Sequence, residues 1–349
     1  MARLSHTSIP AQAPCAPTQP IEGDIVNITR ILLSGVACAM LSSPAAHAAD
    51  PYPTKPIRWV VPYSAGGGSD ALARTVATQM GAQMGQQLIV DNRPGGAAVI
   101  GAEIVTKAAG DGYTIMSADN GPLVFNTALF KTLPYNPEKD LAPVGLMARF
   151  PLLLVVNPSS GYTTAKQLIE DMRSHPGKLS YATAGIGSPH HVAMEMLRER
   201  AKFDAVHVAY KGAAPAIQDV VGGQVPLMVV DAGAGMPMIK AGKLKVLATF
   251  AKSRLISMPE IPTLIELGFT DIEAVAWQGL VVPSTTPAHI VDRLSAEMQK
   301  AVNTPSVRAR LLELGLEPIP SDPANMAKRW REDVNFWPKL IRERNISLD

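Results

Sequence analysis

The stretch IRWVVPYSAGGGSDALAR, residues 57–74, decides the fold because it joins a strand, a turn and a helix. Ile57–Pro62 is a short apolar run of strand length, and Leu72, Val76 and Met80 follow at the four-residue spacing of an amphipathic helix. Three consecutive glycines lie between the two patterns. A turn of this kind exposes unpaired backbone N–H groups at the positive end of a helix, where anions bind. The sequence therefore predicts an anion-binding turn.

Strand and helix patterns alternate along the rest of the chain. Gln87–Val90 and Tyr113–Ser117 are predicted strands with a helix between them, which completes a βαβαβ unit typical of a parallel sheet. A second α/β series begins near residue 150. Its predicted strands are Leu152–Val156, Leu179–Thr183, Val206–Ala209, Val225–Val230, Leu244–Thr249 and Ala274–Val282. We expect two α/β domains connected by crossing strands, with the ligand cleft between them.

The N-terminal region has the pattern of a secretory signal. An apolar run over residues 31–41 follows Arg30 and precedes Ala46-His47-Ala48, a small-x-small cleavage pattern. The run is shorter than the roughly 20 apolar residues that span a membrane. We therefore expect residues 1–48 to be a signal peptide and the mature protein to be periplasmic. Residues 1–24 lie upstream of the signal pattern and are consistent with a start codon assigned too early.

Composition excludes several classes of function. The chain has 349 residues, of which 47% are hydrophobic, and its net charge of +2 is too weak to indicate a nucleic-acid partner. Both cysteines, Cys15 and Cys38, precede the predicted cleavage site. The mature chain is therefore expected to have no disulfide, no thiol catalysis and no cysteine metal site.

A second glycine-rich loop resembles the first in its setting. We call Tyr63–Asp70 loop one and Thr183–His191, with the sequence TAGIGSPHH, loop two. Each follows a predicted strand and opens a predicted helix. A single helix dipole stabilises an exposed anion by only about 0.3–1 kcal/mol. Two such loops facing each other across a cleft would hold a carboxylate without any arginine.

Loop one also matches a nucleotide-binding pattern. Residues 66–71 fit G-x-G-x-x-A, and Asp91 lies near the position of a ribose-binding acid. An oxidoreductase that binds a NAD-type dinucleotide is therefore an alternative function. The predicted signal peptide argues against it, because nicotinamide cofactors are cytoplasmic. A P-loop is excluded because no Gly-Lys-Ser/Thr follows the glycines.

Loop two contains residue types that occur in catalytic and metal sites. Ser188 lacks the G-x-S-x-G surroundings of a nucleophile elbow, and Pro189 directly after it cannot supply an oxyanion-hole N–H. Adjacent His190 and His191 point about 100° apart on a helix, which is poor chelating geometry. We therefore expect no catalytic residues, no metal site and no cofactor.

Several polar residues lie at strand ends, where α/β sheets bind ligands. Asp231 ends an apolar strand, and either a ligand contact or a helix cap is consistent with its position. Asn120 and Asn126 follow the third strand, and each fits a ligand contact or a turn. Asp70 fits a helix cap or a contact for a donor group. Trp277 is more typical of a core than of a pocket wall.

Taken together, these motifs resemble one family. The string YPTKPIRWVVPYSAGGGSDALAR resembles the mature start of the Bug, or TctC-like, receptors of tripartite tricarboxylate transporters. Further matching strings follow in the same order: VDNRPGGAAVIGAE, DGYTIM, NTALFKTLPYNPEKDLAPVGLMA, AGIGSPHHVAMEML, HVAYKGAAPAIQDVVGGQVPLM and AGKLKVLA. The resemblance extends from residue 52 to about residue 345.

The resemblance implies a periplasmic binding protein of the two-domain, Venus-flytrap, type II fold. Domain I is expected over residues 50–149 and 252–349, and domain II over residues 150–251. A small carboxylate is expected in the cleft, held largely by backbone amides and bridging waters. The expected ligand-binding residues are Tyr63, Ser64, Ala65, Gly66, Gly67, Asp70, Ser117, Asn120, Asn126, Thr183, Ala184, Gly185, Ser188, His190 and Asp231.

The sequence departs from the family pattern in two places. SADNGPLVFN differs from the small-residue runs expected after the third strand, and His190 occupies a position that varies in the family. Ser117–Asn120 and His190 are therefore expected to tune ligand choice. We expect a non-catalytic monomer that works with membrane subunits of a transporter or with a sensor. A ligand-free signalling partner of a membrane protein is a further alternative.

Overall fold

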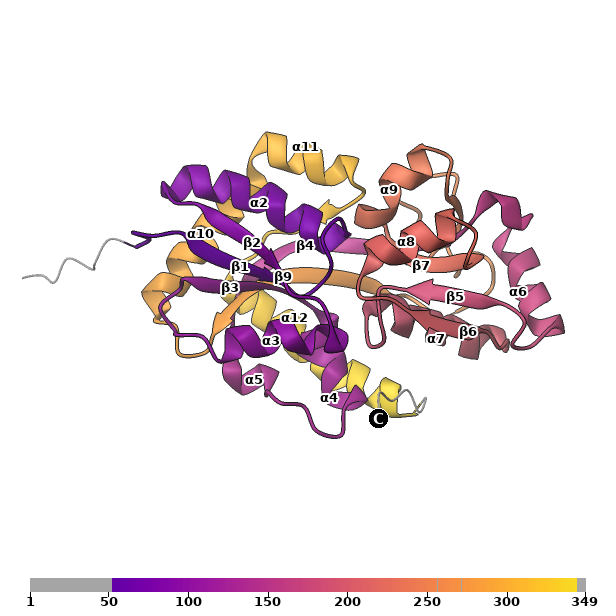
Figure 1. Cartoon of the computed structure of the whole chain (residues 1–349), viewed down its shortest axis with the longest axis horizontal. Coiled ribbons are helices and arrows are strands. Elements are labelled where there is room, and N and C mark those ends of the chain that lie inside the picture. The colour runs from indigo at the N-terminus through magenta and orange to yellow at the C-terminus, as the bar shows by residue number, and fades with distance from the viewer. Residues whose placement is uncertain (1–51, 256, 271, 344–349) are drawn as a thin grey trace, which may run out of the picture. The chain divides into compact units, whose positions relative to one another are not determined.

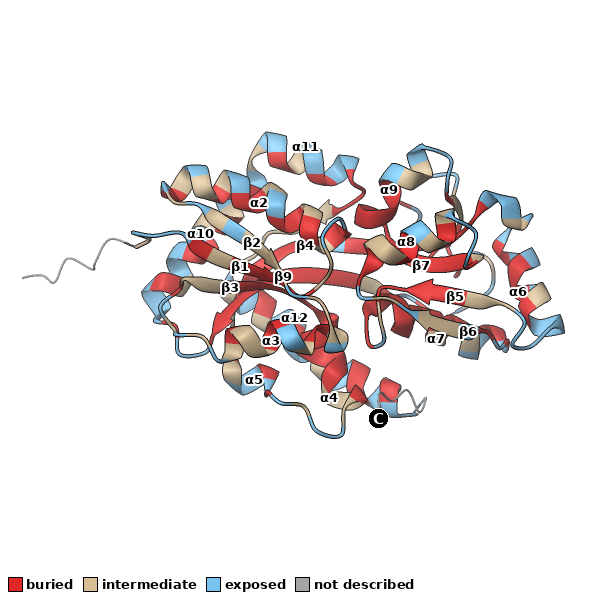
Figure 2. Cartoon of the chain, viewed as in Figure 1, coloured by how far each residue is buried: buried red, intermediate tan, exposed pale blue. Residues whose placement is uncertain are grey.

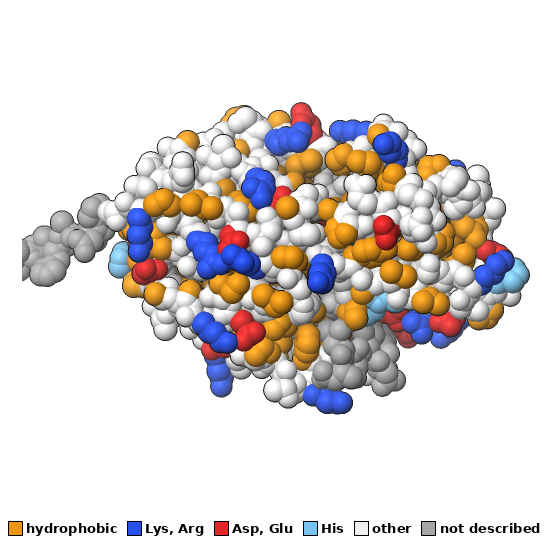
Figure 3. All heavy atoms as spheres, viewed as in Figure 1, with side chains coloured by type: hydrophobic (Ala, Val, Ile, Leu, Met, Phe, Trp, Pro, Cys, Tyr) orange, Lys and Arg blue, Asp and Glu red, His pale blue; other side chains and the backbone are white. Residues whose placement is uncertain are grey.

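The structure is a computed structural model and describes residues 52–343 except 256 and 271 (Figure 1). The predicted signal peptide lies outside the described residues. Among the helices of the described part of the chain, none is long and apolar enough to cross a membrane. On the face drawn in Figure 3, basic and acidic side chains are interspersed among apolar ones.

The predicted βαβαβ unit is confirmed. Strand β1 (Ile57–Val61) pairs in parallel with β2 (Leu88–Asn92) on one side and with β3 (Thr114–Asp119) on the other. Helix α2 (Gly68–Met84) connects β1 to β2, and α3 (Val99–Thr106) lies between β2 and β3 in the chain. In the view of Figure 1, α2 lies above this sheet and α3 below it. The carboxyl end of β1 therefore leads directly into loop one.

Two antiparallel strands extend this sheet and connect it to a second one. Strand β9 (Val275–Pro283) pairs antiparallel with β3 and with β4 (Leu141–Val156). The first part of β4, to Pro151, pairs with β9, and the part from Leu152 onward pairs with the second sheet. The prediction began β4 only at Leu152, because two prolines and a glycine interrupt the earlier run with turn-like signals. The pairing is register-shifted there, which accommodates these residues within one strand.

The second sheet consists of the end of β4 and four further strands. Its order runs from β4 through β7 (Leu227–Asp231) and β5 (Ser180–Thr183) to β6 (Val206–Ala209), and β8 (Lys245–Thr249) also pairs with β4. The α/β prediction for this half is confirmed, because parallel strands β7, β5 and β6 alternate with helices. These helices are α6 (Ala165–Ser174), α7 (Pro189–Ala201), α8 (Ala213–Val221) and α9 (Ala232–Lys240).

Short elements and three C-terminal helices complete the described fold. Thr164 accepts the Gln167 N–H through its side chain and caps α6. Pro287 precedes α10 and Pro323 is the first residue of α12, and proline suits a helix start because the first N–H groups have no partner within the helix. The remaining elements are η1 (Gly96–Ala98), η2 (Gly121–Phe125), α4 (Asn126–Leu129), α5 (Pro137–Asp140), η3 (Pro158–Ser160), α10 (Ala288–Asn303), α11 (Pro305–Glu313), β10 (Glu317–Pro318) and α12 (Pro323–Glu343).

Strand β7 of the second sheet is buried along its whole length, so both of its faces are covered (Figure 2). Leu227 and Val229 belong to the apolar cluster that includes residues of α6 and α7. Met228 and Val230 point to the opposite face and join a second cluster that includes residues of α8 and α9. Burial of each such side chain stabilises the fold by about 1.5–3 kcal/mol. The sheet is therefore a rigid platform for the loops at its strand ends.

Candidate functional site

A small buried cavity lies where the strand ends of the two sheets meet, and we call it the central cavity. Its volume is about 40 Å³, whereas one water occupies about 30 Å³ in the liquid. Its walls come from loop one, loop two, the end of β3, Phe150 on β4, the starts of α7 and α8, the end of β7 and the first part of β9. The lining residues that matter most below are Tyr63, Gly68, Asp119, His190, Asp231 and Gln278.

Two helix N-termini face this cavity without a side-chain cap. Gly67 is the N-cap of α2 and Gly212 is the N-cap of α8, and neither position has a capping side chain. Gly67, Gly68 and Ala213 all line the cavity. The first N–H groups of a helix have no partner within the helix, so they are free to donate to an anion. Loop one is joined to the turn before α8 by the Ser64 N–H, which donates to the Lys211 carbonyl at 3.3 Å.

Two further helices begin at the cavity, but their own residues cap them. Ser188 Oγ accepts the His191 N–H at 3.3 Å at the start of α7. Asp231 Oδ1 accepts the Ala234 N–H at 2.8 Å at the start of α9. Pro189 has no N–H to offer. The uncapped donors of the site therefore come mainly from α2 and α8.

Asp119 is a buried carboxylate in the wall of the cavity. Its Oδ1 accepts the Tyr63 hydroxyl at 3.0 Å and the Gly121 N–H at 2.8 Å. Burial raises the pKa of Asp119 to about 6, against the lowering effect of these two hydrogen bonds. The pKa of Tyr63 is raised well above 10, first by burial and then by the adjacent Asp119. The Asp119 carboxyl group is therefore harder to ionise than a solvated aspartic acid.

His190 and Asp231 form a second buried pair. His190 Nε2 lies 3.2 Å from Asp231 Oδ2 and accepts the Asp231 N–H at 3.1 Å. With the ring proton on Nδ1, Nε2 accepts the Asp231 N–H, and with the proton on Nε2 it donates to Asp231 Oδ2. His190 Nδ1 is buried and has no hydrogen-bond partner among the described residues. The ring therefore has an unused polar atom beside the cavity.

The structure brings one group of the predicted site residues together. Tyr63, Gly67, Ala184, His190 and Asp231 line the central cavity. Ala184, Gly185 and Ser188 line an adjoining groove of about 330 Å³, which shares Tyr63 with the cavity. Loop one and loop two thus meet at one site. The side of loop one that touches α8 is made by Gly66, whose α-carbon faces the Ala214 methyl group.

A second group makes hydrogen bonds within the fold. Asp70 accepts from the Gly66 N–H at 2.9 Å and from Arg74 and Asn92, so it stabilises the turn of loop one. Burial by itself would raise the pKa of Asp70, but these hydrogen bonds and the Arg74 charge lower it. Ser117 accepts the Trp59 indole N–H at 2.8 Å in the core.

The two asparagines after β3 likewise face other parts of the fold. Asn120 donates to Asp333 on α12 at 2.8 Å, and Asn126 donates to the Ala97 carbonyl at 2.9 Å. In the loops, Thr183 Oγ1 lies 2.7 Å from His207 Nε2, and Ala65 is exposed. Ser64 Oγ is buried without a partner among the described residues.

Sequence reasoning did not select Phe150, Trp277 or Gln278, which line the cavity, and it included Asp119 only within the range Ser117–Asn120 that is expected to tune ligand choice. The strand-end rule pointed to Asn120, and one residue earlier it would have found Asp119. Trp277 and Gln278 lie within β9, far along the chain from both glycine loops, and no motif marks them. Asp91, the acid of the nucleotide-like pattern, pairs with Arg58 at 2.6 Å and with Arg93.

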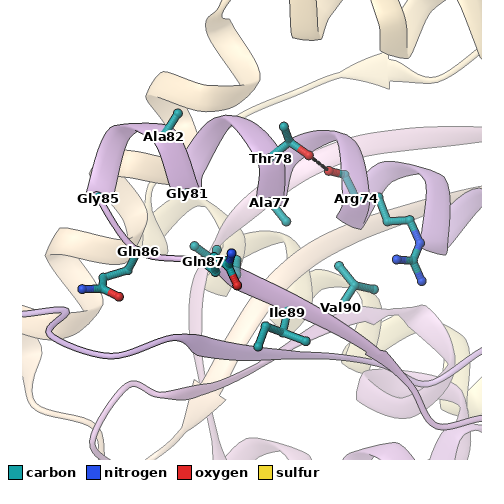
Figure 4. A pocket seen from close by; sticks show the side chains of 11 residues that line it. Arg74, Ala77, Thr78, Gly81, Ala82, Gly85, Gln86, Gln87, Ile89 and Val90 are labelled. Carbon is teal, nitrogen blue, oxygen red and sulfur yellow. Dashed lines mark hydrogen bonds between the residues drawn. The ribbon is translucent and has the colours of Figure 1, made fainter.

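Another groove lies apart from the helix N-termini, between α2 and β2 (Figure 4). Its volume is about 640 Å³, and its polar lining residues include Arg74, Thr78 and Gln87, which are exposed. It lacks the buried charges that converge on the central cavity, so we assign the ligand site to the cavity. No group of three or more metal-ligating side chains occurs in the described part of the chain.

Comparison with known proteins identifies the family. The chain matches the model of the tripartite tricarboxylate transporter family receptor over residues 72–346. A protein of Pseudomonas sp. (strain P51), from the tcbD–tcbE intergenic region, is 37% identical over 93% of this chain and 98% of its own length. BugT of Bordetella pertussis is 30% identical over 93% of this chain and 100% of its own length.

Solved structures of similar proteins have the same fold. Rpa4515 of R. palustris with adipate has a TM-score of 0.83 and 31% identity, over 85% of this chain and 100% of its own. MatC from Rhodopseudomonas palustris with bound malate has a TM-score of 0.80 and 31% identity, over 83% of this chain and 100% of its own. The periplasmic binding protein BugD has a TM-score of 0.82 and 31% identity, over 84% of this chain and 99% of its own. This chain therefore belongs to the TctC family of tripartite tricarboxylate transporter receptors, whose solved relatives are periplasmic binding proteins of this α/β fold.

Proposed function

We propose that this receptor captures a small carboxylate in the central cavity and presents it to a membrane partner, without performing chemistry on it. One observation carries the proposal: the uncapped N-termini of α2 and α8 converge on a buried cavity. Among the described residues, neither lysine nor arginine lines this cavity. Backbone N–H groups and helix dipoles are then the main donors for an anion, and each dipole is worth up to about 2 kcal/mol when partly buried.

We further propose that the two sheets belong to separate domains, residues 50–149 with 252–349 and residues 150–251, and that they move apart to admit the ligand. The volume of about 40 Å³ supports this, because pockets for small molecules usually measure about 300–1,000 Å³. The connections near Phe150 on β4 and Ala276 on β9 are the candidate hinges. Small-angle scattering with and without a saturating ligand tests the motion, and identical curves would contradict it.

Ligand binding is tested by thermal unfolding in a panel of mono-, di- and tricarboxylates, amino acids and aromatic acids. A ligand that binds only the folded state raises the free energy of unfolding by about 2.7 kcal/mol at a hundredfold excess over Kd. We expect at least one carboxylate to raise the melting temperature, while its neutral amide analogue does not. A panel in which no acid shifts the melting temperature would overturn the proposed function.

We also propose export to the periplasm after removal of residues 1–48, action as a monomer, and delivery to the membrane subunits of a transporter or to a sensor. The family membership and the N-terminal sequence pattern support these proposals. The intact mass of protein from the periplasmic fraction tests the cleavage site, because a mass that includes residues 1–48 contradicts it. A dimer in solution at micromolar concentration would contradict the monomer.

A further inference from the structure

We propose that the central cavity selects a carboxylate that also carries a protonated amine, with the ammonium group bound between Asp119, Asp231 and the side-chain oxygen of Gln278. This inference rests on the proposed function and names the ligand class of the same site. It follows from the balance of charge and of hydrogen-bonding groups in the cavity wall, on the side that the backbone donors do not occupy.

The charged groups of the wall are predominantly acidic. Asp119 and Asp231 are 8% and 5% exposed, and both line the cavity. The basic side chain in this wall is His190, whose Nε2 lies 3.2 Å from Asp231 Oδ2. A second carboxylate group on the ligand would add a negative charge to two that are already buried. Like charges at short range in a poorly solvated site repel strongly, whereas an ammonium group would neutralise one of them.

Unused hydrogen-bond acceptors point to the same ligand chemistry. Gln278 is 1% exposed and lines the cavity, and its Nε2 donates to Ser69 Oγ. Its Oε1 is buried without a partner among the described residues. Buried polar atoms are nearly always satisfied in native proteins. An ammonium group has three donors and no acceptor, so it fits a wall that offers carboxylate and amide oxygens.

The two ends of such a ligand would meet different chemistry. The N–H groups at the starts of α2 and α8 face its carboxylate, and the acidic wall faces its ammonium group. The charged groups that act on Asp119 are His190 on α7 and Asp231 at the end of β7. Tyr63 donates a hydrogen bond to Asp119, and the Asp119 charge raises the pKa of Tyr135. Burial raises the pKa of Asp119, Asp231 raises it further, and His190 lowers it.

The test compares ligands that differ by one group. Malate and aspartate differ by a hydroxyl or an ammonium on one carbon, and adipate and 6-aminohexanoate differ at one terminus. By calorimetry at pH 7 we expect the amino member of at least one pair to bind at least about tenfold more tightly. The affinity of the amino ligand should rise between pH 5 and pH 7, because Asp119, whose pKa is about 6, ionises over this range.

Variants separate this inference from the proposed function. Asp119→Asn keeps an acceptor for Tyr63 and Gly121 but removes the charge, and it should weaken the amino ligand at least about tenfold while leaving the dicarboxylate unchanged or tighter. Asp111→Asn removes the same charge from an exposed residue and should change neither affinity. The inference is overturned if both dicarboxylates bind more tightly than their amino partners. It is also overturned if none of the four ligands binds. The proposed function survives either result if another acid in the panel binds.

Discussion

At the scale of single residues, Gly68 decides how closely the two sheets approach. It is the first residue of α2, and a side chain there would place Cβ 2.0 Å from Asp231 Oδ1 and 3.1 Å from Phe150 Cε1. Asp231 cannot rotate away without cost, because the same oxygen caps α9 through the Ala234 N–H. The absence of a side chain at Gly68 therefore allows the start of α2 and the start of α9 to meet at the cavity.

We expect Gly68→Ala to abolish ligand-dependent stabilisation while leaving the unliganded melting temperature nearly unchanged, because the sheets would separate to relieve the clash. Affinity should fall at least about tenfold. Gly67→Ala is the matched control: its φ is −82° and its Cβ would lie 3.6 Å from the nearest atom. Calorimetry with the best acid from the panel measures both variants. Equal affinities for the two variants would refute this role of Gly68.

At the scale of elements, a buried hydrogen-bond network connects β9 and the end of β3 to α12. Asp333 Oδ2 accepts the Trp277 indole N–H at 2.6 Å and the Asn120 amide at 2.8 Å, and Oδ1 pairs with Arg329 at 3.2 Å. Asn120 Oδ1 in turn accepts the backbone N–H of Trp277 at 3.2 Å. The network fixes Trp277, which lines the cavity, and Asn120, which lies next to Asp119, so it positions this part of the cavity wall.

Asp333→Ala should lower the free energy of unfolding by about 2–4 kcal/mol, because it leaves two buried donors without an acceptor. Asp333→Asn keeps one oxygen acceptor. It also removes a carboxyl group whose pKa burial has raised, so this variant should lose less free energy of unfolding than Asp333→Ala. Urea denaturation measures both. Glu332→Ala, one position earlier and exposed, should change the stability by less than about 0.5 kcal/mol. If Asp333→Ala lowers the free energy of unfolding no more than Glu332→Ala does, the stabilising role of the network is contradicted.

At the scale of the whole molecule, buried histidines oppose buried acids in setting the response to pH. His207 stacks between Tyr181 and His191, with centroid distances of 4.9 Å and 4.2 Å. Burial and then the Arg198 charge lower the pKa of His191 to about 4, and burial and then His191 lower the pKa of His207 to about 3, although Glu195 opposes the latter shift. The unfolded chain therefore binds more protons at these two sites below pH 6.5, and the folded chain binds more at Asp119.

Stability should therefore fall as the pH falls from about 6.5 to 4, since two histidines favour protonation of the unfolded state and Asp119 offsets one of them. His207→Phe keeps an aromatic ring in the stack but removes one titrating group. The free energy of unfolding of this variant should therefore depend less steeply on pH over this window, by the equivalent of up to one bound proton. His289→Phe, at an exposed position, should keep the wild-type slope. Denaturation at pH 4, 5, 6 and 7 measures the slopes, and parallel curves for the two variants would disprove this assignment.

The sequence by itself determined the alternation of strands and helices, the family, and the two glycine loops, because these depend on local spacing and on motifs that are contiguous in the chain. Only the tertiary structure decided the composition of the cavity wall. Asp119 and Gln278 lie far apart in sequence and reach one cavity because β3 and β9 pair side by side. For the same reason Asn120 turned toward Asp333 while Asp119 faced the cavity. Which polar group at a strand end meets a ligand depends on what packs behind it, and that packing partner comes from α12 at the other end of the chain.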